Sequence, residues 1–303
     1  MIAFKLEEFF NTTSLDKVAE LYEVITKERL TVKDTGINYR VINHWDEKGL
    51  IRFARKSKEG NRKFSLADFI WIKLVNELRE FGVKLTDIQK IAADIYEPLP
   101  MKELMDTLAE NLDSLENMEG EDKEGFIEFL KSGEYKTAEI PDLGFNYLHL
   151  LISEAISTRT PISILVFKNG DWFPFMKNKE DQYPEDLLYK KEFFSHIQVS
   201  VTETIFSYIF EDYFKNYLEE LHIFTPQEAK LLYHIKEGDF KKVFVLFKSK
   251  KHEPVEISQG KTAKEEIMKI IRAKQYREFI LIDSKNNEFR IRENQTEKES
   301  QLN

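Results

Sequence analysis

Residues 36–45, with the sequence Gly-Ile-Asn-Tyr-Arg-Val-Ile-Asn-His-Trp, decide the fold of the N-terminal part of this chain. Gly36 suits a tight turn between two short helices, because glycine adopts backbone conformations that other residues avoid. Asn38 is a typical N-cap for the second of these helices. A small core is predicted from the apolar residues that recur at helical spacing, namely Val32, Ile37, Val41, Ile42 and Trp45. The pattern predicts a helix-turn-helix.

A basic hairpin is predicted directly after this motif. Residues 51–55 and 62–64 have the pattern of two short strands, and residues 56–61 that of the turn between them. The run from Arg52 to Lys63 contains six basic residues and one acidic residue. Because a basic hairpin that follows a helix-turn-helix is typical of a wing, we expect a winged-helix domain over residues 27–96.

Further helices are predicted on both sides of the motif. An N-terminal extension over residues 1–26 contains a helix that Ser14 can cap. After the hairpin, Ser65 caps a helix that is predicted to reach about Glu80, and another helix is predicted over residues 85–95.

The charge of the chain is unevenly distributed. The net charge is −9, which by itself argues against a nucleic-acid partner. Residues 27–90, however, contain 15 Lys and Arg against 9 Asp and Glu, a net of +6, which leaves −15 for the remainder. Phosphate contact depends on the local field of a patch rather than on the whole-chain total. A basic run is often only a solvated face, but this one falls within the predicted winged helix-turn-helix.

Four pieces of sequence, in the same order and with loops of matching length, resemble the DNA-binding domain of the MerR family of winged-helix regulators. They are residues 36–42, 45–51, 60–65 and 78–88. The resemblance implies that the second helix enters the major groove and that the wing straddles the DNA backbone. It also implies a dimer that binds a promoter pseudo-palindrome and distorts the spacer between the polymerase recognition elements, so RNA polymerase is an indirect partner. It covers only the N-terminal part of the chain.

Ten residues are candidates for contact with double-stranded DNA. Base edges are expected to be read from the second helix by Tyr39, Arg40, Asn43 and His44. Phosphates are expected to be held by the wing residues Arg52, Arg55, Lys56, Lys58, Arg62 and Lys63. The resemblance places Arg40 and Arg62 where DNA-contacting arginines lie in the family. Asn43 and His44 stand where Arg and Tyr are frequent, so a different target sequence is expected.

A linking helix is predicted over residues 97–119. Its apolar residues follow a heptad seam, at Met101, Met105, Leu108, Leu112 and Leu115. The resemblance implies an antiparallel helix here and hence a homodimer. The alternative, an amphipathic helix packed on its own domain, is equally favoured. Residues 120–141 are charged and contain glycine, so we place a linker and a domain boundary there.

The C-terminal half, residues 142–293, is predicted to be a mixed α/β domain, and the chain as a whole is therefore assigned to the α+β class. The predicted elements are a helix over 143–157, a hairpin turning at Asn169-Gly170, a helix over 202–221 and a strand-strand-helix-strand-strand unit over 242–292. In a regulator of the MerR type this half would sense an effector. The aromatic residues of 202–221 either line an apolar effector pocket or form core, and core is favoured. Residues 294–303 are predicted to be a disordered tail.

No pattern of catalytic or metal-ligating residues is found. The chain has no cysteine, which excludes thiolate chemistry and zinc–sulfur sites. Gly260-Lys261-Thr262 lacks the earlier glycine of a phosphate-binding loop, because that position is Val255. None of the six histidines has the spacing of a metal site on a helix. We therefore expect no enzymatic activity, no cofactor and no metal.

The expected location is the cytoplasm, because the sequence has neither an apolar run of about 20 residues nor the features of a signal peptide. Two alternative functions stay open beside a regulator. A protein-binding module, similar to the chaperone modulators, would reuse the helix-turn-helix; the basic wing argues against it, and the acidic remainder argues mildly for it. A DNA-architectural or excision factor of a mobile element would keep the DNA contacts and lose the effector.

Overall fold

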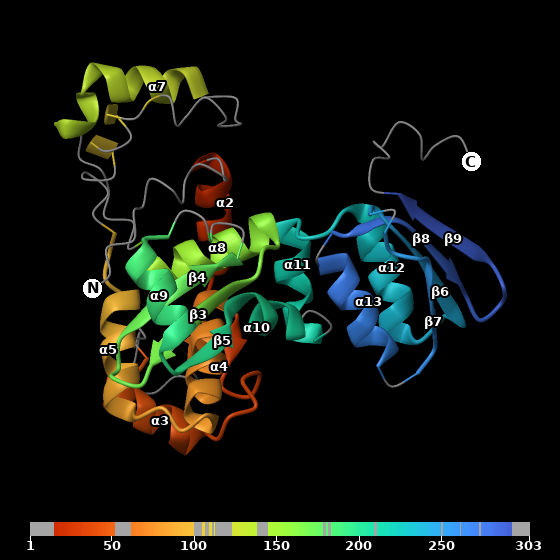
Figure 1. Cartoon of the computed structure of the whole chain (residues 1–303), viewed down its shortest axis with the longest axis horizontal. Coiled ribbons are helices and arrows are strands. Elements are labelled where there is room, and N and C mark those ends of the chain that lie inside the picture. The colour runs from red at the N-terminus through yellow and green to blue at the C-terminus, as the bar shows by residue number, and fades with distance from the viewer. Residues whose placement is uncertain are drawn as a thin grey trace. The chain divides into compact units, whose positions relative to one another are not determined.

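The computed structural model describes most of the chain between residues 15 and 292 (Figure 1). The described residues are 15–51, 62–99, 105–106, 109–110, 112, 123–137, 145–177, 180, 183–208, 211–249, 251–260, 262–272 and 274–292. They confirm the α+β class. The chain divides into two compact units, which comprise residues 1–221 and residues 222–303.

The helix-turn-helix lies within the first unit. The helices of this region are α2 (Leu15–Ile25), which precedes the motif, and α3 (Tyr39–Glu47), α4 (Leu66–Glu80) and α5 (Leu85–Ile95). They confirm the predicted helices, and α4 begins at a capping box in which Ser65 and Asp68 each accept a hydrogen bond from the backbone N–H of the other. Trp71 of α4 is fully buried, and its indole nitrogen donates to the Leu50 carbonyl at 2.7 Å.

A short two-stranded sheet borders this domain. Strand β1 (Leu30–Thr31) pairs antiparallel with β2 (Lys63–Phe64), and Leu30 lies opposite Phe64. Strand β1 was not predicted from the sequence. The other predicted strand of the wing hairpin, residues 51–55, lies outside the described residues except for Ile51, which is buried in a bend.

A three-stranded antiparallel sheet completes the core of the first unit. Its elements, with the helices beside it, are α8 (Tyr147–Thr158), β3 (Ile162–Phe167), β4 (Trp172–Met176), α9 (Glu185–Phe193) and β5 (His196–Ser200). The strand order is β4-β3-β5, and the hairpin predicted at Asn169-Gly170 is confirmed. Helix α9 was not predicted. Because α8 contacts α2, α4 and α5, and β5 contacts α4, this sheet and its helices close the core of the helix-turn-helix.

The helix predicted over residues 202–221 is wrong as a single element. The structure has α10 (Val201–Ser207), the 3-10 turn η4 (Asp212–Phe214) and α11 (Lys215–Leu221). A straight helix would spread the aromatic side chains of this segment around its axis. The break instead allows both Phe214 and Tyr217 to be fully buried, and the preference for core over a ligand pocket agrees with their burial.

Residues 97–137 also differ from the prediction. The linking helix predicted from residue 97 does not begin there, because the Leu99 N–H donates to the Phe145 carbonyl at 2.8 Å and Pro98 bridges Asn146. Most of the heptad seam lies outside the described residues. The predicted linker over 120–141 contains α7 (Lys123–Ser132) and η2 (Glu134–Lys136), in which Leu130 and Tyr135 are buried. The many charged residues of this segment predict a linker, and they outnumber the two apolar residues that are buried.

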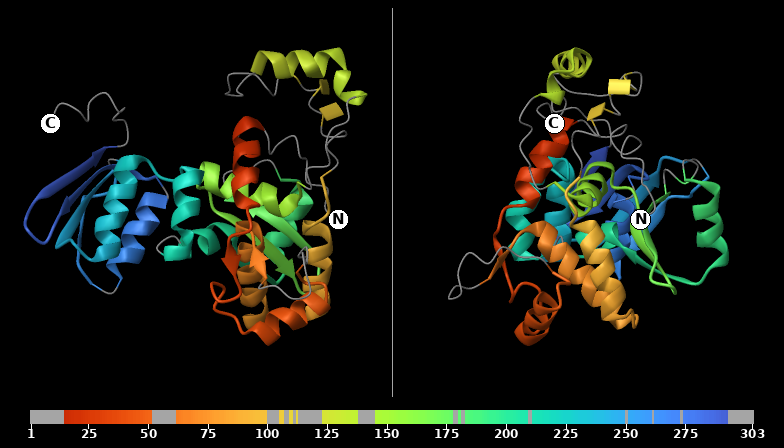
Figure 2. Two further views of the ribbon diagram at one scale, coloured as in Figure 1. Left: turned by 180° about the vertical axis from the view of Figure 1, so that it is seen from behind. Right: turned by 90° about the vertical axis from the view of Figure 1, so that its left-hand side faces the viewer.

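The second unit is a four-stranded antiparallel sheet with two helices on one face (Figure 2). Its elements are α12 (Pro226–Glu237), β6 (Lys242–Phe247), β7 (Val255–Ser258), α13 (Ala263–Arg272), β8 (Tyr276–Ile282) and β9 (Glu288–Arg292). The predicted order of strands and helix over 242–292 is confirmed. The strand order is β7-β6-β8-β9.

The compact units and the predicted domains divide the chain differently. The predicted domain over 142–293 is split after Leu221, and its first part belongs to the same unit as the helix-turn-helix. The remaining boundaries of the domain scheme stay predictions. Within the part of the chain that the structure describes, no helix is long and apolar enough to cross a membrane.

Candidate nucleic-acid interface

The turn that precedes α3 is fixed by side-chain hydrogen bonds. The Asp34 carboxylate accepts from the backbone N–H and the hydroxyl of Thr31, at 2.7 and 2.8 Å. The buried Thr35 hydroxyl donates to the Val32 carbonyl at 2.6 Å. Gly36 has a φ of +65°, which favours glycine at this position. The first short helix predicted here is therefore a series of hydrogen-bonded turns, although Gly36 has the predicted role.

Helix α3 presents a mixed outer face. Asn38 caps it, and its side-chain oxygen accepts from the Arg40 N–H at 2.9 Å, as predicted. Ile42 and Trp45 are buried in the domain core. The predicted contact residues Tyr39, Arg40 and His44 are exposed.

Two residues of α3 depart from the prediction. Val41, predicted as core, is 39% exposed and lies on the outer surface. Asn43, predicted to face DNA, is half-buried, and its side-chain oxygen is buried without a hydrogen-bond partner in the described structure. Neither placement is evident from spacing alone, because positions at the margin of an apolar stripe can turn either way.

Arg62 lies inward, toward α3. Its guanidinium pairs with the Asp46 carboxylate at 2.9 Å, and the two side chains are only 14% and 15% exposed. The guanidinium carbon also lies 5.8 Å from the centre of the Tyr39 ring. The other terminal nitrogen, Nη1, is buried and has no hydrogen-bond partner among the described residues. In the described structure, therefore, Arg62 joins the base of the predicted wing to both ends of α3.

The other predicted wing residues are less well placed by the structure. Lys63 is exposed on β2. Four residues lie outside the described part of the chain, namely Arg52, Arg55, Lys56 and Lys58.

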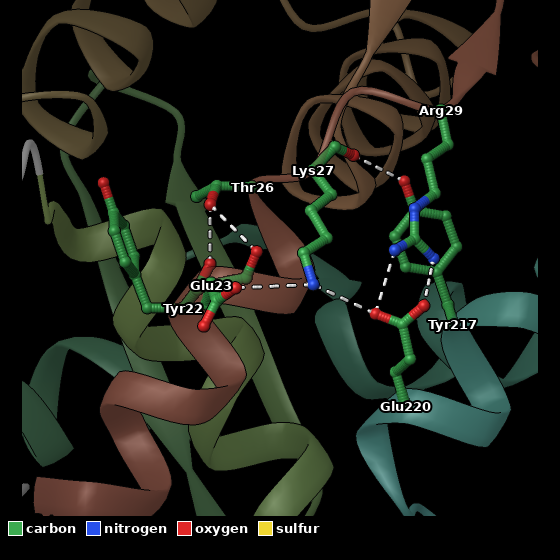
Figure 3. A network of polar contacts seen from close by, with 7 residues as sticks. All are labelled: Tyr22, Glu23, Thr26, Lys27, Arg29, Tyr217 and Glu220. Carbon is green, nitrogen blue, oxygen red and sulfur yellow. Dashed lines mark hydrogen bonds and ion pairs between the residues drawn. The ribbon is translucent and has the colours of Figure 1, made fainter.

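Three further basic residues of the 27–90 segment are engaged in contacts within the first unit. The Lys73 ammonium donates to the Thr35 carbonyl at 2.7 Å, and it lies 4.4 Å from the centre of the Tyr208 ring. Lys27 and Arg29 both pair with Glu220 (Figure 3). The net charge of the segment therefore overstates the positive charge that it can offer to a partner.

The contacts of Lys27, Arg29, Tyr217 and Glu220 form a clamp between α11 and the segment that joins α2 to β1 (Figure 3). Arg29 holds both oxygens of the Glu220 carboxylate, at 2.6 and 2.9 Å, and Lys27 approaches it at 3.2 Å. The buried Tyr217 hydroxyl donates to the Lys27 carbonyl at 2.7 Å. Hydrogen bonds from Arg29 and Lys27 outweigh partial burial and lower the pKa of Glu220 to about 2.

We expect Glu220→Gln to lower the melting temperature at neutral pH. The pKa of Glu220 is lower in the folded chain than its ordinary value of 4.5. The contribution of Glu220 to stability is therefore complete above pH 4.5 and is lost as the pH falls through about 2. The difference between wild type and variant should shrink over that range, as followed by circular dichroism. Glu219→Gln, at an exposed neighbour, is the control. Identical pH profiles for all three chains would contradict the clamp.

The comparison with known families identifies the class of this domain. Residues 31–95 match the model of a family described as MerR HTH family regulatory protein. This part of the chain is a helix-turn-helix domain of the MerR family, which confirms the resemblance, and at the level of the family it is the domain of a DNA-binding regulator. Neither a curated protein nor a solved structure matches the chain significantly.

Proposed function

We propose that the chain is a sequence-specific transcriptional regulator that binds a promoter pseudo-palindrome as a dimer. The observation that carries this proposal is the exposed outer face of α3, within a segment that matches the MerR family. Tyr39, Arg40 and His44 are free to reach base edges in a major groove. The exposed Val41 adds an apolar group of the kind that contacts a thymine methyl.

The remaining predicted contacts are assigned by their surroundings. Lys63, together with the basic residues of 52–58, is proposed to hold phosphates and set the register on DNA. Arg62 is proposed to position the wing against α3, because it is paired with Asp46 and largely buried. Asn43 is a weaker candidate for a base contact, since its amide oxygen is buried. Control by an effector and an indirect action on RNA polymerase complete the proposal.

The protein-binding module is retained as the second candidate function. It is favoured by the engagement of Lys27, Arg29, Arg62 and Lys73 in contacts within the chain, which reduces the positive surface around the motif. A salt titration separates the two functions. Binding that depends on phosphate contacts weakens roughly tenfold or more for a few-fold rise in salt when several contacts are made.

A selection from random double-stranded DNA by the purified full chain tests the proposal. An enriched inverted repeat supports sequence-specific binding by a two-fold symmetric dimer. A single enriched half-site supports the reading of bases without the dimer. No enrichment by a chain that is folded by circular dichroism contradicts the proposal and favours the protein-binding module.

On the selected DNA, Arg40→Ala is expected either to weaken binding to all sequences or to relax the base preference. If Arg40 holds a phosphate, the slope of log affinity against log salt should fall by about one. If it reads a base, selection with the variant should lose one position of the motif. Lys90→Ala, an exposed cation on α5, is the matched control. If Arg40→Ala had the same affinity, salt slope and selected motif as Lys90→Ala, α3 would not face DNA.

A further inference from the structure

The sheet of the second unit has two chemically different faces. Successive side chains of a strand point to opposite faces, and the residues that point toward α12 and α13, such as Val243 and Leu281, are fully buried. Within the described part of this unit, both helices lie on that same side (Figure 2). The opposite side, which we call the open face, is centred on Phe244, Leu246, Ile280 and Ile282.

These four residues form a continuous apolar centre. Phe244 of β6 lies directly opposite Ile280 of β8, and Ile282 lies opposite Lys242 in the next row. All four are half-buried, although Val245 and Phe279 on the helix-covered face are completely buried. The two central strands therefore present a row of partly exposed aliphatic and aromatic side chains.

The charged rim of the open face is balanced. Its members are Lys242, Arg290, Arg292, Glu256, Glu278 and Glu288. Each is paired within the sheet: Lys242 lies 3.5 Å from Glu256, Arg292 lies 3.0 Å from Glu278, and Arg290 pairs with Glu288. The balance of three cations against three anions provides no excess positive field for nucleic acid.

We propose that the open face binds the open face of a second copy of this chain. An apolar centre with a rim of both signs is complementary to itself, as a two-fold interface requires. A two-fold axis parallel to the strands places β9 of one copy over β7 of the other. Arg290 and Arg292, which are 50% and 54% exposed, then lie near Glu256 of the second copy, which is 45% exposed. This interface is separate from the predicted seam of residues 97–119.

The absence of native cysteine makes a direct test available. Ile280→Cys puts one thiol near the proposed two-fold axis, and Lys269→Cys puts one on the exposed surface of α13. Treatment of the full chain with a short bis-maleimide is expected to link Ile280→Cys chains in pairs, at least about tenfold more than Lys269→Cys chains at the same concentration. Equal linking of the two chains overturns the proposal.

A charge-reversal series keeps the result interpretable if one variant folds poorly. Adding Phe244→Glu, or separately Phe244→Lys, to the Ile280→Cys chain buries like charges at the interface and should lower linking about tenfold or more. Mixing the two variants should restore linking, which a folding defect cannot do. Linking that is unaffected by either charge, or not restored by mixing, overturns the proposal. The DNA selection is an independent readout, so failure here leaves the proposed function to its own test.

Discussion

Asp46→Asn is expected to weaken binding to the selected DNA by about tenfold, although it removes a negative charge from α3, the helix that is proposed to face DNA. The reason is its pairing with Arg62, which ties the base of the predicted wing to α3 at 2.9 Å. A hydrogen bond between charged groups contributes roughly 1.5–3 kcal/mol, and about 1.4 kcal/mol corresponds to a tenfold change in affinity. Its loss is expected to leave the wing incorrectly oriented when DNA binds. Fluorescence anisotropy with labelled DNA measures the effect.

A simple electrostatic account predicts the opposite result, so the experiment distinguishes a positioning role of Arg62 from a phosphate contact. If Arg62 acted mainly as a phosphate contact, removing its intramolecular partner would release it for DNA and strengthen binding. Glu47→Gln is the matched control, because Glu47 is the exposed acid next to Asp46 on the same helix. It should leave affinity unchanged or raise it slightly.

The double variant completes the cycle for this ion pair. Arg62→Ala alone is expected to weaken binding to all sequences. Combined with Asp46→Asn, it should be scarcely weaker than Arg62→Ala alone, because both changes remove the same contact. Additive losses, or stronger binding by Asp46→Asn, would return Arg62 to the role of an independent phosphate contact.

Phe214→Ala should destabilise the first unit by about 3–5 kcal/mol, the usual loss for truncating a buried aromatic side chain. Phe214 is fully buried, and its ring lies 6.5 Å from Phe69 of α4 and 6.0 Å from Tyr217. The side chain therefore belongs to a core shared between the helix-turn-helix and residues that lie far along the chain. Binding to the selected DNA should be lost at the lower urea concentration at which this unit of the variant unfolds.

Urea unfolding followed by tryptophan fluorescence measures this effect in the first unit alone. All three tryptophans, Trp45, Trp71 and Trp172, lie before residue 222. Phe194→Ala supplies the control, because the same truncation at a side chain that is 55% exposed should change stability by less than about 0.5 kcal/mol. Similar losses for the two variants would mean that residues 211–217 do not complete the core.

The elements that could be predicted from sequence are those whose signals are local. Ser65 and Asp68 stand three residues apart, so the capping box that starts α4 is visible in the sequence. The turn at Asn169-Gly170 and the alternation of β6 are equally local, and both were predicted. Helix α9 was not predicted because its apolar residues do not form one stripe. Tyr189 and Phe193 of this helix are exposed, as is Phe194 directly after it.

The features that could not be predicted depend on contacts between distant residues. Arg62 and Asp46 are 16 residues apart, and Lys27 and Glu220 are 193 apart. Residue type and spacing identified Arg62 as a basic residue of the wing, but only the folded chain shows which carboxylate it contacts. The exposed Val41 and the half-buried Asn43 differ from prediction for the same reason, because their neighbours come from elsewhere in the chain.

The dependence of the helix-turn-helix on Phe214 and Tyr217 also sets the order of events during synthesis. The segment that matches the MerR family ends at residue 95, yet its core is closed by side chains that emerge from the ribosome more than a hundred residues later. At about 5–20 residues per second, that interval lasts roughly 6–25 seconds. A nascent chain therefore exposes Phe69 and its neighbours until α11 has been made. The helix-turn-helix can therefore complete its core only after residues 214–217 have left the ribosome.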